Sequence, residues 1–128
     1  MGITHADIRV ENLFTRRSLD ARALVDSGAV FLTIPEHLAV QLGFDLSEVS
    51  TAIQADGSNK ANPMAVPMVG PLRVRFADRY CDLSTLVMGD EPLFGAVPMK
   101  MMDLVIHPAS QRLTVNPASP YVPVALAK

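Results

Sequence analysis

The chain has 128 residues, of which 49% are hydrophobic and 19% charged, and its net charge is −2. This length predicts a single domain spanning residues 1–128, and the charge balance argues against nucleic acid as a partner. No apolar run is long enough to cross a membrane.

The single Cys81 cannot form an internal disulfide, and three scattered histidines give no zinc-ligand spacing. We therefore expect no metal, no cofactor and no membrane partner. With no signal-peptide pattern at the N-terminus, we also expect a reducing, cytoplasmic location.

The hydrophobic share is high for a small domain, whose large surface-to-volume ratio demands polar residues. Exposed apolar surface usually marks an interface, so we expect part of this surface to meet a partner. The alternative is that Ala and Val in ordinary strands account for the composition.

The first part of the chain predicts short strands, because 10 Pro and 7 Gly interrupt longer elements. Apolar and charged side chains alternate over residues 6–14 and again over 19–25, with a polar turn at 12–18 between them. This pattern predicts a hairpin that delivers Asp26 to its end. Residues 30–33 then predict a third, short strand.

A short helix is predicted directly after this strand. Thr33-Ile34-Pro35-Glu36 fits a capping box, and Pro is tolerated in the first helical turn. Leu38, Ala39 and Leu42 follow at helical spacing, and Gly43 supplies a stop.

The second part of the chain begins with a predicted hairpin over 51–68. Its turn is Ala55-Asp56-Gly57-Ser58, because Asp-Gly favours positive φ angles, and the Pro residues in its polar arms suit a peripheral position. The remaining predicted elements are strands at 72–76, 80–88 and 112–115, a helix at 98–104 and an extended tail at 117–128. A glycine turn followed by a short helix occurs in both halves, which suggests a faint internal repeat.

Asp26-Ser27-Gly28-Ala29 is the most informative stretch of the chain. It lies between the apolar runs 23–25 and 30–34. A carboxylate in such a setting is costly to bury unless it is hydrogen-bonded, and Ser and Gly suit a tight turn beside it. A carboxylate at a strand-to-turn junction, with a hydroxyl and a glycine next to it, is what an aspartic peptidase needs.

The chain resembles the retroviral-type, or retropepsin-like, aspartic peptidases and their bacterial and cellular relatives. The resemblance rests on Ala23-Leu24-Val25-Asp26-Ser27-Gly28-Ala29, on the downstream helix, on the Asp56-Gly57 hairpin and on the later apolar-apolar-Gly sequence Leu93-Phe94-Gly95. It spans about residues 6–116, which we take as the core of the domain. The resemblance implies an all-β fold with one or two short helices, a closed acid-protease barrel and one lobe per chain.

The resemblance also implies a catalytic role for Asp26. In this family two carboxylates share one proton; one activates water and the other protonates the carbonyl oxygen. The second half of this chain has no acid at Leu93-Phe94-Gly95, so a homodimer is expected, with one Asp26 from each subunit. By position, Ser27 would lock the two active-site loops, the Gly28 amide would help to hold the carboxylate, and Ala29 would line the cleft.

The flap of the family falls on residues 55–58, which would close over a peptide or protein substrate. Viral flaps are richer in glycine than this one. The tail has no clear counterpart, although Tyr121 to Leu126 could join a sheet between subunits.

Two other functions stay open at this point. One is a retropepsin-like dimer that binds peptides or assists assembly without hydrolysis, because a fold does not guarantee an activity. The other is an unrelated small β-barrel binding domain. Paired Asp26 carboxylates would distinguish the peptidase from the latter, and activity would distinguish it from the former.

Overall fold

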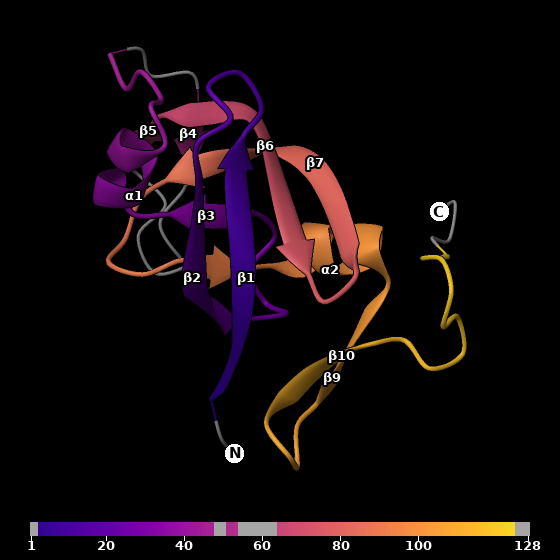
Figure 1. Cartoon of the computed structure of the whole chain (residues 1–128). Helices are drawn as coiled ribbons and strands as arrows, with labels where there is room; N and C mark the ends of the chain where they lie inside the picture. Colours follow the sequence, from indigo (N-terminus) through magenta and orange to yellow (C-terminus); the bar gives the residue numbers. More distant parts are fainter. Residues whose placement is uncertain (1–2, 48–50, 54–63, 125–128) are drawn as a thin grey trace.

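The computed structural model describes residues 3–47, 51–53 and 64–124, and its main feature is a closed barrel (Figure 1). The strand order is β1-β2-β8-β3-β7-β6. These strands are β1 (Thr4–Asn12), β2 (Ser18–Val25), β3 (Leu32–Ile34), β6 (Met68–Phe76), β7 (Arg79–Val87) and β8 (Leu93–Phe94). Two short helices, α1 (Glu36–Gln41) and α2 (Ala96–Met102), complete a mainly β fold, as predicted. Among the described residues, no helix has the length and apolarity needed to span a bilayer.

The predicted first hairpin is confirmed. β1 and β2 pair antiparallel from Thr4↔Val25 to Glu11↔Ser18. Along β1, Ile8 and Val10 are buried, whereas the alternating charged side chain of Arg9 faces outward. The period-two pattern in the sequence thus sets which face of the hairpin enters the core.

The predicted internal repeat is visible in the topology. The order β1-β2-β3-α1 recurs as β6-β7-β8-α2. The repeats exchange their third strands, because β8 pairs in parallel with β2 and β3 pairs in parallel with β7. The Asp26 amide donates to the Phe94 carbonyl at 3.1 Å, and the Met88 amide donates to the Ile34 carbonyl at 3.0 Å. The position equivalent to Asp26 is therefore Met88, and not the Gly95 turn that the sequence suggested.

The hydrophobic core fills the barrel and extends beneath both helices. Cys81 belongs to this core, and burial raises the pKa of its thiol to about 12. The largest fully buried side chains are Phe94, Leu32, Ile34, Leu42, Leu72, Leu86 and Met102.

The capping box predicted for α1 is wrong. Thr33 lies inside β3, where it is buried and pairs with Leu86 on one side and Leu93 on the other. The N-cap is Pro35, which makes no side-chain cap hydrogen bond. Thr33 therefore pairs with neighbouring strands instead of capping the helix as the local sequence had predicted. Gly43 does end the helix, with φ of 85°.

The second helix begins two residues earlier than predicted, at Ala96, and it ends at Met102. Leu104, which we expected at the helix end, instead begins β9 (Leu104–His107), a strand that the sequence analysis missed. β9 pairs antiparallel with β10 (Arg112–Val115), and this hairpin projects from the barrel on the side of the N-terminus (Figure 1).

The arms of the predicted peripheral hairpin are present as β4 (Thr51–Ile53) and β5 (Met64–Val66). They pair antiparallel with the register Thr51↔Val66, apart from the barrel. Its turn at 55–58 lies outside the described residues.

The segment 116–124 forms turns and bends rather than the extended tail we expected. It is held by Asp103, whose carboxylate accepts hydrogen bonds from the Ser119 hydroxyl, from Asn116 Nδ2 at 3.1 Å and from the Val124 amide at 3.0 Å. The buried guanidinium of Arg79 binds the Asp103 carbonyl at 3.0 Å and also the Ser119 carbonyl. This polar cluster overrides the extended preference of a proline-rich segment.

These hydrogen bonds predict a pH-sensitive attachment of residues 116–124. The Ser119 hydroxyl, the Asn116 amide and the Val124 amide hold the pKa of Asp103 below its ordinary value of 3.8. The attachment is therefore complete above that value and is lost as the pH falls through the lowered pKa. Asp103→Asn, which tolerates the left-handed backbone at φ of 55°, should accelerate hydrogen exchange at the Val124 amide at neutral pH. The Val74 amide in the barrel is the control, and unchanged exchange at Val124 would contradict the assignment.

Candidate active site

Asp26 follows directly on β2 and is exposed at the end of the barrel where the N-terminus enters. Thr4 pairs with Val25, so the first residues of β1 lie beside the Asp26 loop. The amide of Asp26 donates to the Phe94 carbonyl of β8 at 3.1 Å. Two strands from distant parts of the chain thus fix the backbone that carries this carboxylate.

The Asp26 carboxylate is oriented by its own loop. The Gly28 amide donates to Asp26 Oδ1 at 2.9 Å, and the Ala29 amide donates to the Asp26 carbonyl at 3.1 Å. Within the described part of the chain, Asp26 Oδ2 and the Ser27 hydroxyl have no hydrogen-bond partner. The loop therefore holds one carboxylate oxygen and presents the other, together with a hydroxyl, to the surface.

Gly95 and the two residues after it pack closely against the loop that follows Asp26. The Ala96 amide donates to the Ala29 carbonyl at 2.8 Å, and the Val97 amide donates to the Val30 carbonyl at 2.9 Å. A Cβ at position 95 would lie 2.4 Å from the Phe31 carbonyl oxygen and 2.8 Å from that of Ala29. Only glycine permits this approach. The predicted Leu93, Phe94 and Gly95 sequence is thus brought against the Asp26 loop by backbone contacts.

A pocket of about 400 Å³ opens beside the carboxylate. Asp26 is the one acidic residue among its described lining residues. Ile106 and Pro108, at the end of β9, contribute to the wall. Sequence reasoning missed them, although the run Leu104-Val105-Ile106 carries the β-branched signal of a strand. The full lining consists of Ile3, Thr4, Leu24, Val25, Asp26, Ser27, Ile106 and Pro108.

Apolar side chains are exposed on the segments that flank this site. Ile3 is 65% exposed at the start of the described chain, and Val30 and Phe31 are 55% and 39% exposed after the Asp26 loop. On α2, Val97 and Met101 are 36% and 42% exposed. Their neighbours Met99 and Met102 are buried in the core. Exposed apolar groups around one site indicate a surface that becomes covered.

The predicted flap residues Ala55, Asp56, Gly57 and Ser58 lie outside the described residues, so their position relative to Asp26 stays a prediction. Over the ranges 3–47, 51–53 and 64–124, no three His, Cys, Asp or Glu side chains gather as metal ligands would.

The sequence of the chain decides its family. A family model described as aspartyl protease matches residues 8–107, which include the Asp26 loop, both helices and β9. The chain belongs to the aspartyl protease family. A comparison with curated proteins gives no significant match.

Solved structures agree with this assignment at the level of the fold. The chain is similar to the retroviral protease-like domain of Ddi1 from Leishmania major, with 17% identity, coverage of 91% of both chains and a TM-score of 0.59. It is also similar to a retropepsin-like aspartic protease from Rickettsia conorii, with 18% identity, coverage of 84% of this chain and 89% of that one, and a TM-score of 0.50. The retropepsin-like fold inferred from the sequence is therefore confirmed.

The contact at Gly95 predicts a cost for any side chain there. Gly95→Ala should destabilise the fold by about 1–3 kcal/mol, because the added methyl group meets backbone carbonyls that cannot move without disturbing the Asp26 loop. Chemical denaturation measures this difference. Gly89→Ala is the control, since its Cβ would meet no atom closer than 4.0 Å and its cost comes only from the φ of 81°. A loss at Gly95 no larger than that at Gly89 would contradict the packing argument.

Proposed function

We propose that this chain is a homodimeric aspartic endopeptidase in which Asp26 of each subunit forms the catalytic pair. The observation that carries the proposal is the exposed Asp26 carboxylate, which the Gly28 amide orients through one oxygen at 2.9 Å. Membership of the aspartyl protease family supports the reaction class.

The chemistry requires two carboxylates in contact. Like charges a few ångströms apart cannot both ionise, so the pair shares one proton, as in the aspartic proteases that exemplify this rule. The ionised member takes a proton from water, which attacks the carbonyl carbon of the peptide bond. The protonated member donates to the carbonyl oxygen. The pair titrates as a unit, and its apparent pKa values belong to both groups together.

Among the described residues, one chain offers a single carboxylate in this setting. The pseudo-repeat puts Met88 at the position equivalent to Asp26, and Met88 binds the Ile34 carbonyl where Asp26 binds that of Phe94. Because β3 and β8 run antiparallel, the two loops lie at opposite ends of that strand pair. A second acid in the matching position must therefore come from a second chain, related by a two-fold axis.

The surroundings of Asp26 support such a dimer. The exposed apolar groups Ile3, Val30 and Phe31 lie next to the site, and burial between two chains would remove them from water. In this arrangement the Ser27 hydroxyl, which has no hydrogen-bond partner among the described residues, would lock the two loops, and Ala29 would line the cleft.

The substrate in this proposal is a peptide or protein. It would lie in the cleft between the two Asp26 loops, and residues 55–58 would close over it. A reducing, cytoplasmic location belongs to the same proposal, and the buried thiol of Cys81 suits it.

Asp26→Asn should leave the fold and the dimer intact but lower peptide cleavage by about a thousandfold or more, because the amide can neither serve as base nor share a proton. Incubation with a diverse peptide mixture from acidic to neutral pH, followed by mass spectrometry, measures this loss. Asp45→Asn is the matched control, since Asp45 is also an exposed loop aspartate whose carboxylate accepts a backbone amide at 2.9 Å.

Full activity in Asp26→Asn would remove Asp26 as the catalytic residue. A stable monomer at high concentration, measured by sedimentation, would contradict the shared site. A folded dimer that cuts no peptide at any pH would instead assign the chain to the non-hydrolytic peptide-binding class.

A further inference from the structure

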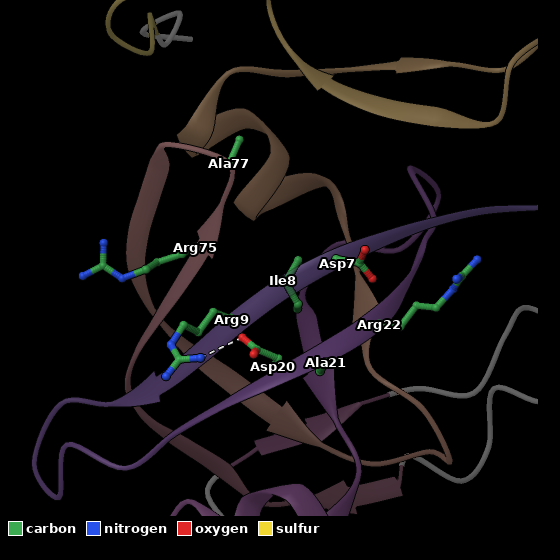
Figure 2. A pocket seen from close by; sticks show the side chains of 8 residues that line it. All are labelled: Asp7, Ile8, Arg9, Asp20, Ala21, Arg22, Arg75 and Ala77. Carbon is green, nitrogen blue, oxygen red and sulfur yellow. Dashed lines mark hydrogen bonds and ion pairs between the residues drawn. The ribbon is translucent and has the colours of Figure 1, made fainter.

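A second hollow lies on the outer face of the barrel, where β2, β1 and β6 run side by side (Figure 2). Its volume is about 570 Å³. It is lined by Asp7, Ile8, Arg9, Asp20, Ala21, Arg22, Arg75 and Ala77. This face carries charged side chains, in contrast to the apolar surroundings of Asp26.

The register of the strands aligns one row of side chains across this face. Asp20 on β2 pairs with Arg9 on β1, Arg9 pairs with Arg75 on β6, and Arg75 pairs with Tyr80 on β7. Two guanidinium groups therefore occupy directly opposed positions on neighbouring strands. Figure 2 shows both arginines projecting toward the same side of the sheet. Like charges directly opposed across strands are destabilising.

The two arginines differ in their partners. Arg9 binds Asp20 at 2.8 Å and the Ser18 hydroxyl at 2.8 Å. Arg75 stacks on the Tyr80 ring, with 5.3 Å from its Cζ to the ring centroid, and no carboxylate of the described residues lies within ion-pair distance of it.

In the next row of the sheet, Arg73 has a carboxylate that balances its charge. Arg73 binds both carboxylate oxygens of Asp82, at 2.7 and 2.9 Å, and it also stacks on Tyr80 at 4.3 Å. Arg75 lies farther from the same ring, at 5.3 Å, and has no carboxylate partner among the described residues. Its fork of donors is thus available to a ligand.

We propose that this face docks an acidic segment of a partner protein, with one carboxylate of that segment bound by Arg75 beside Arg9. A carboxylate in this position would offset the opposed positive charges. The barrel is closed, so β1 and β6 offer no free edge for strand addition, and recognition falls to side chains. Asp7 and Asp20 border the same hollow and would repel a continuous polyanion such as nucleic acid. Carboxylates spaced along a peptide fit this hollow better than a continuous row of phosphates.

The proposal is independent of hydrolysis, so its test measures binding alone. The probe is a fluorescein-labelled short peptide of alternating Glu and Ser, followed by fluorescence anisotropy at low and high salt. The same peptide with Gln for Glu is the control probe. We expect the protein to bind the acidic probe more tightly than the Gln probe. We also expect its affinity for the acidic probe to fall as the salt concentration rises.

The decisive variant is Arg75→Gln, which should weaken the acidic probe about tenfold, as expected for loss of a charge-assisted pair. The affinity of Arg75→Lys for the acidic probe should lie between those of the wild type and Arg75→Gln, because lysine keeps the charge without the bidentate fork. Arg112→Gln is the matched control, since Arg112 is an exposed arginine on β10 and its loss changes the net charge equally. Unchanged thermal melting establishes that each variant folds.

Several results would overturn the proposal. They are absence of binding at low salt, equal weakening by Arg75→Gln and Arg112→Gln, and tighter binding of a single-stranded oligonucleotide than of the acidic peptide. Loss of self-association in Arg75→Gln would assign the face to a second copy of the chain and would also overturn it.

Discussion

The approach of the Gly95 backbone to the loop after Asp26 is the constraint on which the site depends. The Phe31 and Ala29 carbonyls lie where a side chain at position 95 would be, and the Ala96 and Val97 amides bind the same loop. Because Phe94 is fully buried and its carbonyl binds the Asp26 amide, the hydrophobic core also holds the carboxylate in place. The loop after Asp26 is therefore positioned mainly by backbone contacts with residues 94–97, in addition to the hydrogen bond from the Gly28 amide to the Asp26 carboxylate.

The pseudo-repeat explains both how the two halves of the barrel interlock and why the Asp26 position has no acidic counterpart in the second half. Exchange of β3 and β8 between the halves interlocks them through parallel pairs on either side. The first repeat ends β2 at an aspartate, whereas the second ends β7 near Met88, whose amide makes the corresponding backbone bond. The fold thus keeps the backbone symmetry and carries the acid once, which is the physical reason to expect a second chain.

The sequence predicted the parts of the structure that local patterns control. The alternation along β1 and β2, the helix stop at Gly43 and the turn at Asp26 each depend on neighbouring residues, and they lie where expected. The errors arise where distant contacts prevail. Thr33 pairs with two strands instead of capping α1, β9 forms against β10, and Asp103 draws residues 116–124 into turns. The opposed Arg9 and Arg75 likewise become visible only once the register is known.

The most direct test of the shared site mixes wild-type protein with Asp26→Asn at equal concentrations, under conditions where subunits exchange. If both carboxylates are needed, only dimers of two wild-type chains cut peptide. Random pairing then predicts about one quarter of the activity of the same total amount of wild-type protein. An activity of about one half would show that each chain works alone, and it would contradict a catalytic pair built from two Asp26 residues.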